Sequence, residues 1–427
     1  MEFTEELLCF LWKFRLFNQK QLATETGEAL GILSPGIHNR ESGPDFEQAK
    51  IKIGSTIWAG NIEMHLRSSD WDNHRHSRDR AYNNVILHVV VENDRVIKRP
   101  DGTEIPTLVV KDLIPEHIKV RYRDLIENLY RIPCENRLNS VDEFHINGWL
   151  GRVLIERLEE KSSIVFQFLD ECKGSWDDAF YIMLARNFGF KINALPFELL
   201  AKSLPQTILA KHKSNSLQIE ALIFGQAGFL ADRVEDDYFQ QLQKEYYFLR
   251  KKYNLHSLDK SLWKFLRLRP NNFPTLRLAQ FSALVVKSNH LLSEILETKD
   301  PASLRRLFDQ LPVHPYWDNH YLFGKPSLKK SSGIGQTSVN NILLNTVALF
   351  IFAYGKRTGV PSLVSRAIEI LEGLPFEENQ ITAIFTEIGV KKRGADLSQA
   401  LLQQKKRYCD TKRCLDCGIG TKLINQN

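Results

Sequence analysis

The chain has 427 residues, of which 43% are hydrophobic and 25% are charged, and its formal net charge at pH 7 is +6. These values are typical of a folded globular protein and exclude a disordered chain, and the length predicts two or three domains. No run of eighteen apolar residues occurs, and the opening stretch MEFTEELLCFLWKF carries acids where a secretory signal carries basic residues. We therefore expect no membrane span and a cytoplasmic location.

The first 115 residues carry most of the strand patterns in the chain. Apolar and polar residues alternate over residues 49–53 and again over 58–66, on either side of Gly54-Ser55, as in a half-buried hairpin. The run VILHVVV is apolar almost throughout and predicts a strand buried on both faces of a sheet. The predicted elements are a helix over 2–17, hairpin strands over 49–53 and 58–66, a helical crossover after Ser77, a buried strand over 85–91 and a second hairpin over 96–110.

Beyond residue 115 long helical patterns replace the strands. The stretches WLGRVLIERLEEKSSIVFQFLDE and NNILLNTVALFIFAYG show helical spacing of their apolar residues. We therefore expect an α+β protein, with a mixed α/β sheet domain over residues 1–115 and a larger all-helical domain over 116–427. Residues 391–427 hold nine Lys or Arg against three Asp. This basic surplus favours either contact with nucleic acid or a solubilising surface.

Acidic and imidazole side chains gather on the polar side of the predicted hairpin. Glu63 and His65 are two places apart on one strand, so their side chains share a face. If the numbers of paired residues sum to 108 or 110, Asp45 lies opposite Glu63 or His65. A strict two-residue loop gives a sum of 109 and places Asp45 opposite Met64, on the other face. A shared site for the two acids therefore requires an odd-length loop or a bulge.

The motif GPD ending at Asp45, the hairpin, the motif EMH from Glu63 to His65 and the crossover to a buried strand together resemble the PD-(D/E)XK nuclease superfold over residues 40–92. The resemblance implies that Asp45 and Glu63 hold Mg²⁺ or Mn²⁺ and that the protein hydrolyses phosphodiesters of DNA or RNA. His65 stands where that family usually has lysine, and a neutral imidazole can serve as a base or a third ligand. The alternative is an inactive nucleic-acid-binding or scaffold protein. The whole chain also resembles an uncharacterised bacterial family of unknown function, which implies no activity.

His74 and His76 support a different interpretation of the same region. A His-x-His pair with a nearby acid recurs in zinc and iron hydrolases, where both imidazoles bind one metal. With Glu63 and His65 these histidines can form a transition-metal site, which predicts a His-rich hydrolase. Taken singly, each of these residues also fits a solvated strand face or a polar loop. His88, inside the apolar run, is expected to be a core histidine.

The cysteines predict a second metal site. Six cysteines in a chain of this length do not make a disulfide framework. Cys409, Cys414 and Cys417 have the spacing Cys-x4-Cys-x2-Cys among basic residues, and Cys134 in the loop RIPCENRL is the candidate for a fourth ligand. Zn²⁺ and an iron-sulfur cluster both fit, and the spacing does not choose between them. Some nucleases of the superfold resembled here hold such a cluster through one early and three late cysteines, with a different late spacing. The alternative is a set of free thiols.

Overall fold

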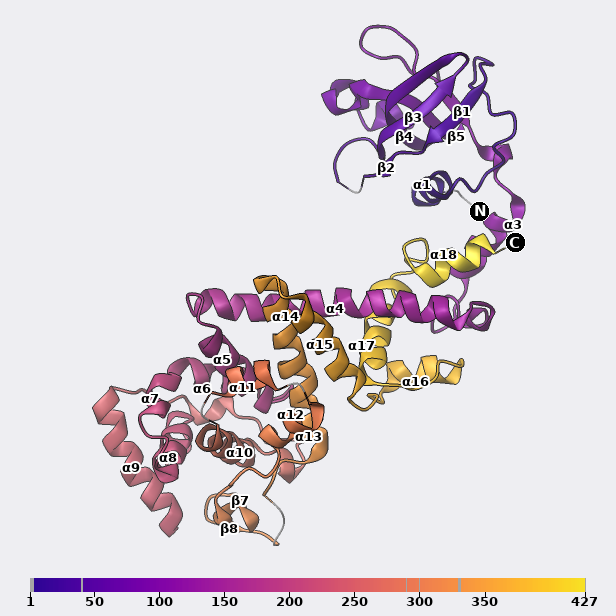
Figure 1. Ribbon diagram of the computed structural model, residues 1–427. Coiled ribbons are helices and arrows are strands. Elements are labelled where there is room, and N and C mark those ends of the chain that lie inside the picture. The colour runs from indigo at the N-terminus through magenta and orange to yellow at the C-terminus, as the bar shows by residue number, and fades with distance from the viewer. Residues whose placement is uncertain (1–3, 40, 289, 299, 329–331, 427) are drawn as a thin grey trace. The chain divides into compact units, whose positions relative to one another are not determined.

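A computed structural model (Figure 1) describes residues 4–39, 41–288, 290–298, 300–328 and 332–426. The chain forms two compact units, of which unit 1 comprises residues 1–149, 384–390 and 403–427 and unit 2 comprises 150–383 and 391–402. Strands and helices mix in unit 1, and unit 2 is mostly helical, so the predicted α+β class is confirmed. The predicted boundary at residues 115/116 lies inside unit 1, because the stretch up to residue 149 and the end of the chain cluster with the sheet.

Unit 1 is built on a mixed sheet with the strand order β1-β3-β4-β5-β6, in which β2 also pairs with β3. Neighbouring strands are antiparallel from β1 through β4, while β4/β5 and β5/β6 are parallel. The strand bounds are β1 Leu30–Ser34, β2 Ile37–His38, β3 Phe46–Ile53, β4 Thr56–Arg67, β5 Val85–Glu92 and β6 Thr107–Val109. The predicted hairpin strands and the predicted buried strand are confirmed, and β5 is buried along all but its last residue.

A bulge in β3 sets the register of the hairpin. From the turn to Ala49, which pairs with Gly60, the loop is a strict two-residue Gly54-Ser55 connection, and this register alone would place Asp45 on the wrong face. The pairing then shifts, so that Phe46 lies opposite Ile62. Gln48, inside the shift, has a φ of 56°, a left-handed conformation typical of a bulge. The bulge therefore supplies the one-residue offset that a shared face for Asp45 and Glu63 requires.

The connection from β4 to β5, predicted as a helical crossover after Ser77, is not one continuous helix. It consists of three short turns of helix, α2 Asp70–Asn73, η1 His76–Arg78 and η2 Arg80–Asn84. Trp71 anchors them, because its side chain is buried with Val85, Ile97 and Ile105. The Asp79 carboxylate accepts a hydrogen bond from the Ala81 backbone N–H and so caps the last turn. The predicted second hairpin is reduced to a bridge between Lys98 and Glu104, after which β6 joins the sheet in parallel.

Helix α1 (Glu5–Phe14) packs against the sheet at β4, as Figure 1 shows. Thr4 caps it by accepting a hydrogen bond from the Leu7 backbone N–H, and its apolar face is buried. The predicted helix over 2–17 is thus shorter in the structure, and residues 2 and 3 lie outside the described part. The remaining helical elements that lie wholly in unit 1 are η3 Lys111–Leu113, α3 Glu116–Glu127, η4 Leu138–Ser140, η9 Lys405–Cys409 and α18 Gly418–Asn425, of which α18 packs on α3.

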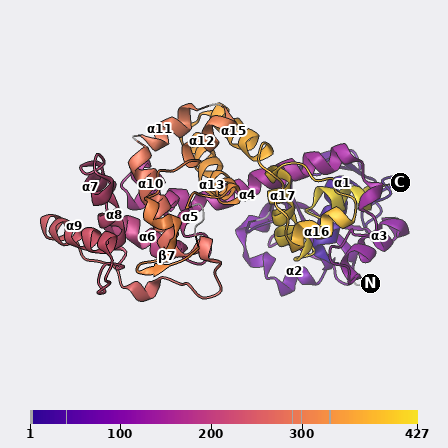
Figure 2. The same ribbon diagram turned by 90° about the horizontal axis from the view of Figure 1, so that it is seen from below.

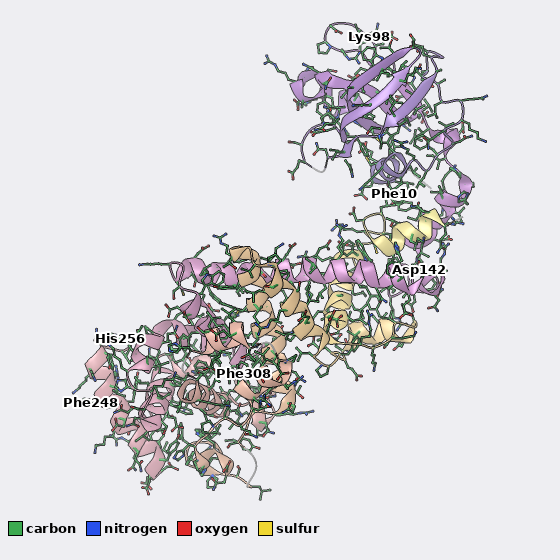
Figure 3. All side chains as sticks on the ribbon, viewed as in Figure 1. Phe10, Lys98, Asp142, Phe248, His256 and Phe308 are labelled. Atoms are coloured by element: carbon green, nitrogen blue, oxygen red, sulfur yellow. The ribbon has the colours of Figure 1, made fainter. Side chains whose placement is uncertain are left out.

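Unit 2 is a helical assembly (Figure 2). Many of its large aromatic side chains are buried in its core. Phe308 is fully buried, whereas Phe248 is 61% exposed on α9 (Figure 3). The helices from α4 onward, three of which cross the division between the units, are α4 Glu143–Glu171, α5 Trp176–Phe188, α6 Ala194–Ser203, α7 Gln206–Ala210, α8 Ser216–Gln226, α9 Asp237–Tyr253, α10 Pro274–Lys287, α11 Leu291–Glu297, α12 Pro301–Phe308, α13 Gln336–Ile342, η8 Leu343–Ala348, α14 Leu349–Thr358, α15 Pro361–Glu372, α16 Gln380–Glu387 and α17 Ala395–Gln404. Smaller elements are η5 Lys260–Leu262, η6 Pro270–Asn272, η7 Pro315–Asp318 and the strand pair β7 His320–Leu322 and β8 Lys325–Pro326.

One continuous helical stretch, Gln336–Thr358, is long and apolar enough to cross a membrane by length and composition. In this structure 72% of its most apolar window is buried inside the protein. Such burial is typical of a core helix, which passes the same test of length and composition.

Candidate metal centre

Asp45 and Glu63 lie side by side at the entrance to the hairpin. The Asp45 backbone N–H donates a hydrogen bond to Glu63 Oε2 over 3.1 Å, and the Met64 backbone N–H donates to Asp45 Oδ2 over 3.0 Å. Each carboxylate therefore holds the backbone of the other strand, and the bulge in β3 makes this exchange possible. The structure brings together the two acids that the sequence predicts as metal ligands.

The environment of this acid pair disfavours two negative charges. Glu63 is only 5% exposed and Asp45 is half-buried. Burial, and then the neighbouring Glu63 carboxylate, raise the pKa of Asp45, and burial raises the pKa of Glu63. A bound cation would offset the repulsion and keep both groups ionised.

Three histidines surround the Glu63 carboxylate. His65 Nε2 lies 3.5 Å from Glu63 Oε1, and His76 Nε2 lies 3.3 Å from the same oxygen. His74 Nδ1 is 3.2 Å from His65 Nε2. One ring nitrogen of each of His65, His74 and His76 lies within 4.8 Å of the other two, a spacing that one metal ion can bridge. His65 and His76 are buried, while His74 is exposed and forms the open side of the cluster.

His88 orients the His65 ring of the cluster through a buried contact. Its Nε2 lies 2.8 Å from His65 Nδ1, so this hydrogen bond leaves His65 Nε2 directed toward Glu63 and His74. His88 is fully buried, as expected of a core histidine, but its contact with His65 is one that sequence reasoning missed. The parallel register explains it, because Glu63 pairs with His88 and the two residues share a face of the sheet.

Aromatic rings enclose the imidazoles and keep them neutral. The Trp71 ring makes edge contacts with His65, His76 and His88, and the Tyr82 ring stacks on His76 with a centroid separation of 3.8 Å. Burial lowers the pKa of His65 to about 2 and that of His88 to about 4, and it also lowers the pKa of His76. Neutral imidazole is the form that binds metals. Tyr82 thus contacts the cluster as well as the apolar residues of the crossover.

Glu5 on α1 is a second residue that sequence reasoning missed. Its negative charge raises the pKa of both Asp45 and Glu63, so it is an electrostatic neighbour of the acid pair. Burial raises its own pKa, while His74 and His76 lower it. No local pattern links residue 5 to residue 63, and only the packing of α1 against β4 brings them near each other.

The donor set fits a transition metal better than Mg²⁺. Glu63, His65, His74 and His76 offer one carboxylate and three imidazoles, whereas Mg²⁺ prefers a shell of oxygen ligands. His76 Nε2 is buried and lies 3.3 Å from Glu63 Oε1 without the geometry of a hydrogen bond among the described residues, so it retains the capacity to bind a ligand. Zn²⁺, Mn²⁺ and Fe²⁺ all suit such a mixed nitrogen and oxygen shell.

The predicted cysteine ligands also lie in unit 1, in a place of their own. Cys134 lies in the loop between α3 and η4, Cys409 ends η9, and Cys414 and Cys417 lie between η9 and α18. All four are buried free thiols. Cys134 is an electrostatic neighbour of Cys409, Cys414 and Cys417.

These features define an α+β protein with a histidine-carboxylate cluster on a mixed sheet. One protein family matches residues 5–380, and it carries the description "Protein of unknown function (DUF2851)". The chain belongs to this family. The matched part includes the histidine-carboxylate cluster and Cys134 and ends before Cys409. No curated protein and no solved structure matches the chain.

Proposed function

We propose that the protein is a metal-dependent hydrolase that cleaves phosphodiester bonds of nucleic acid with a transition metal held by Glu63, His65, His74 and His76. The observation that carries this proposal is the convergence of three neutral imidazoles on the Glu63 carboxylate, with Asp45 beside it. The proposal joins the nuclease hypothesis to the histidine-rich hydrolase hypothesis, because the same carboxylate belongs to both.

The bound metal would polarise the phosphodiester and lower the pKa of an attacking water. Asp45, whose pKa is raised by burial and by Glu63, is suited to accept the proton that this water loses. His88 holds His65 in the orientation that presents Nε2 to the site. Glu5 adds negative charge at the same place and so strengthens the attraction for a cation.

The exposed side of the site carries positive charge suited to a polyanion. Arg75, Arg78 and Arg80 are exposed on the crossover that also carries His74 and His76. Arginine binds phosphate oxygens through paired N–H groups. We propose that these side chains contact the phosphates of the nucleic-acid backbone. Such contacts do not depend on the base sequence.

The proposal draws on the resemblance to the PD-(D/E)XK superfold through the order of chemical groups along the sheet. An acid at the entry of β3, an acid two places before His65 on β4, and a crossover to the parallel strand β5 occur in the expected sequence. His65 cannot replace the positive charge of the lysine usual in that family, because its pKa is lowered to about 2. Hydrolysis would therefore need a stronger Lewis acid than Mg²⁺. The imidazoles would bind a transition metal that meets this need.

The test combines metal analysis with a cleavage assay on the full chain. Purified protein would be stripped of metal, reloaded with Mn²⁺, Zn²⁺, Fe²⁺ or Mg²⁺ in turn, and incubated with linear and circular DNA and with RNA. We expect cleavage with a transition metal, and loss of both cleavage and metal in Glu63→Gln and His74→Ala. His117→Ala, on the exposed side of α3, is the matched control and should retain both. Unchanged cleavage in a variant with Asp45→Ala and Glu63→Ala together would contradict the assignment.

A second function, nucleic-acid binding without turnover, is favoured by the replacement of lysine with a buried neutral histidine at position 65. It predicts retention of nucleic acid that falls steeply with salt and no product with any divalent ion. Cleavage that requires Glu63 would exclude it.

We also propose a cytoplasmic location. All six cysteines are free, as expected in a reducing compartment. Fractionation of cells that express the full chain tests this, and recovery of the protein outside the cytoplasm would contradict it.

A further inference from the structure

Four buried cysteines from two distant parts of the chain meet in unit 1. Cys134, Cys409, Cys414 and Cys417 are between 5% and 8% exposed, and none forms a disulfide. More than 270 residues separate Cys134 from the other three. Burial alone is ordinary for a free cysteine, so it is the meeting of four thiols from distant parts of the chain that points to a shared ligand.

The amide of Gln404 is directed at two of the sulfurs. Its Nε2 donates to Cys417 Sγ over 3.2 Å and to Cys409 Sγ over 3.5 Å. Its Oε1 accepts a hydrogen bond from the Trp149 indole N–H over 2.8 Å, which fixes the amide with its nitrogen toward the thiols. Gln404 is only 2% exposed. A buried donor that serves two sulfurs stabilises them most when they are thiolates.

The backbone around the late cysteines is shaped to present sulfur. The Cys414 N–H donates to the Lys412 carbonyl, and Lys412 is left-handed with a φ of 51°, so the chain turns sharply between the first two ligands. Cys417 is the N-cap residue before α18; burial raises the pKa of its thiol, while hydrogen bonding to the backbone N–H groups of Gly420 and Ile419 in the first turn lowers it. A Cβ at Gly420 would lie 2.2 Å from the Cys414 carbonyl oxygen, so α18 packs directly on this loop.

The four sulfurs are electrostatic neighbours. Burial, and then Cys417 and Cys414, raise the pKa of Cys134 to about 12. Burial, and then Cys134 and Cys417, raise the pKa of Cys409. Burial, and then Cys417 and Cys409, raise the pKa of Cys414 to about 12. These mutual effects mean that the four sulfurs lie near one another, which shared binding of one metal centre requires.

We propose that Cys134, Cys409, Cys414 and Cys417 bind a metal centre through four thiolates, in the form of an iron-sulfur cluster. Four thiolates around a single Zn²⁺ at about 2.3 Å would lie about 3.8 Å apart. Among the described residues the histidine nitrogens form a set of three ligand atoms within 4.8 Å of one another, and the cysteine sulfurs form no such set. This wider spacing suits a cluster in which the thiolates bind different iron ions.

The centre would join the loop that carries Cys134 to the carboxyl-terminal segment of the chain. The same two parts already meet through hydrogen bonds, because Gln426 Nε2 donates to the Ser140 carbonyl and the Lys412 ammonium group donates to backbone carbonyls at Ile126 and Asn128. The proposal is independent of the hydrolase function, since it involves no residue of the histidine-carboxylate cluster.

The test is metal analysis of the full chain purified without oxygen. We expect iron and acid-labile sulfide in similar amounts, with a broad visible absorption that bleaches on exposure to air. Cys134→Ser and Cys417→Ser should each lower the iron and sulfide content at least tenfold. Cys172→Ser, a half-buried cysteine of unit 2, is the matched control and should retain both, as should His74→Ala.

The iron, sulfide and zinc content of the unaltered protein tests the proposal even if a serine variant fails to fold. One zinc per chain, lost in Cys134→Ser but retained in His74→Ala, would overturn the iron-sulfur assignment. Anaerobic protein with neither iron, sulfide nor zinc at the cysteines would overturn the metal centre itself. Loss of cleavage in Glu63→Gln with full iron and sulfide separates this proposal from the hydrolase function.

Discussion

Unit 1 holds two clusters of ligand-type side chains with opposite character. The histidine-carboxylate cluster offers oxygen and nitrogen atoms, and one of its members, His74, is exposed. The cysteine cluster offers only sulfur, and all four of its members are buried. An open site leaves room for a substrate beside the metal, whereas a closed thiolate site stabilises structure. Under the two proposals, the sheet would carry the reaction chemistry and the cysteines would have a structural role.

The largest expected effect is that of Glu63→Gln. This change removes the charge that faces His65 and His76 while it keeps the shape of the side chain. We expect cleavage to fall by about 10³-fold or more, beyond the 10- to 100-fold typical of residues behind the ligands. Single-turnover cleavage with saturating Mn²⁺ measures it. Iron and sulfide at the cysteines should not change, and a joint loss at both clusters would break the distinction between them.

Glu220 in unit 2 sharpens the contrast, since it is a buried acid whose hydrogen-bond partner is a tyrosine. It accepts a hydrogen bond from the Tyr238 hydroxyl over 2.9 Å, and burial raises its pKa to about 7, from an ordinary value of 4.5. A raised carboxyl pKa means that folding favours the protonated form. The contribution of Glu220 to the free energy of unfolding is therefore highest below pH 4.5 and falls as the pH rises to about 7.

Glu220→Gln should remove this dependence. Because a carboxyl pKa raised from 4.5 to about 7 corresponds to about 3 kcal/mol as an upper bound, we expect the variant to be more stable than the parent by up to that amount at pH 8 and equally stable at pH 4.5. Urea unfolding at both pH values measures it. Glu235→Gln, at an exposed position, is the control. Equal stabilities of parent and variant at pH 8 would show that Glu220 is not held protonated by burial.

Gly420→Ala tests the packing beneath the cysteine cluster. The added methyl group would lie 2.2 Å from the Cys414 carbonyl oxygen, so α18 or the cysteine loop must shift. We expect a loss of about 1–3 kcal/mol in the free energy of unfolding and a lower iron content. Gly148→Ala is the matched control, because no atom lies within 4 Å of its added Cβ. A fully stable Gly420→Ala protein with normal iron would contradict the described packing.

His88→Ala tests the support behind the histidine-carboxylate cluster. It removes the hydrogen bond to His65 Nδ1, and we expect Mn²⁺ or Zn²⁺ to bind 10- to 100-fold more weakly. Competition with a chelator of known affinity measures this directly. His88→Asn, whose amide can restore a hydrogen bond, should recover part of the affinity. If Ala and Asn bind metal equally well, His88 only fills the core.

The sequence predicts the strands well and the clusters in part. Alternation identifies β3 and β4, because a sheet with one buried face imposes a period of two. The pairing of Asp45 with Glu63 depends on the bulge at Gln48, which no residue pattern reveals. The electrostatic effect of Glu5 on the acid pair depends on the packing of α1, a tertiary effect. His88 was expected in the core, and only the parallel register of β5 shows that it also supports His65.

Anomalous X-ray diffraction from crystals soaked in Mn²⁺ tests the central claim most directly. We expect one strong manganese peak in unit 1 within bonding distance of Glu63 Oε1 and the ring nitrogens of His65, His74 and His76. The peak should vanish in crystals of Glu63→Gln. Crystals saturated with Mn²⁺ that show no peak between these four side chains would contradict the account.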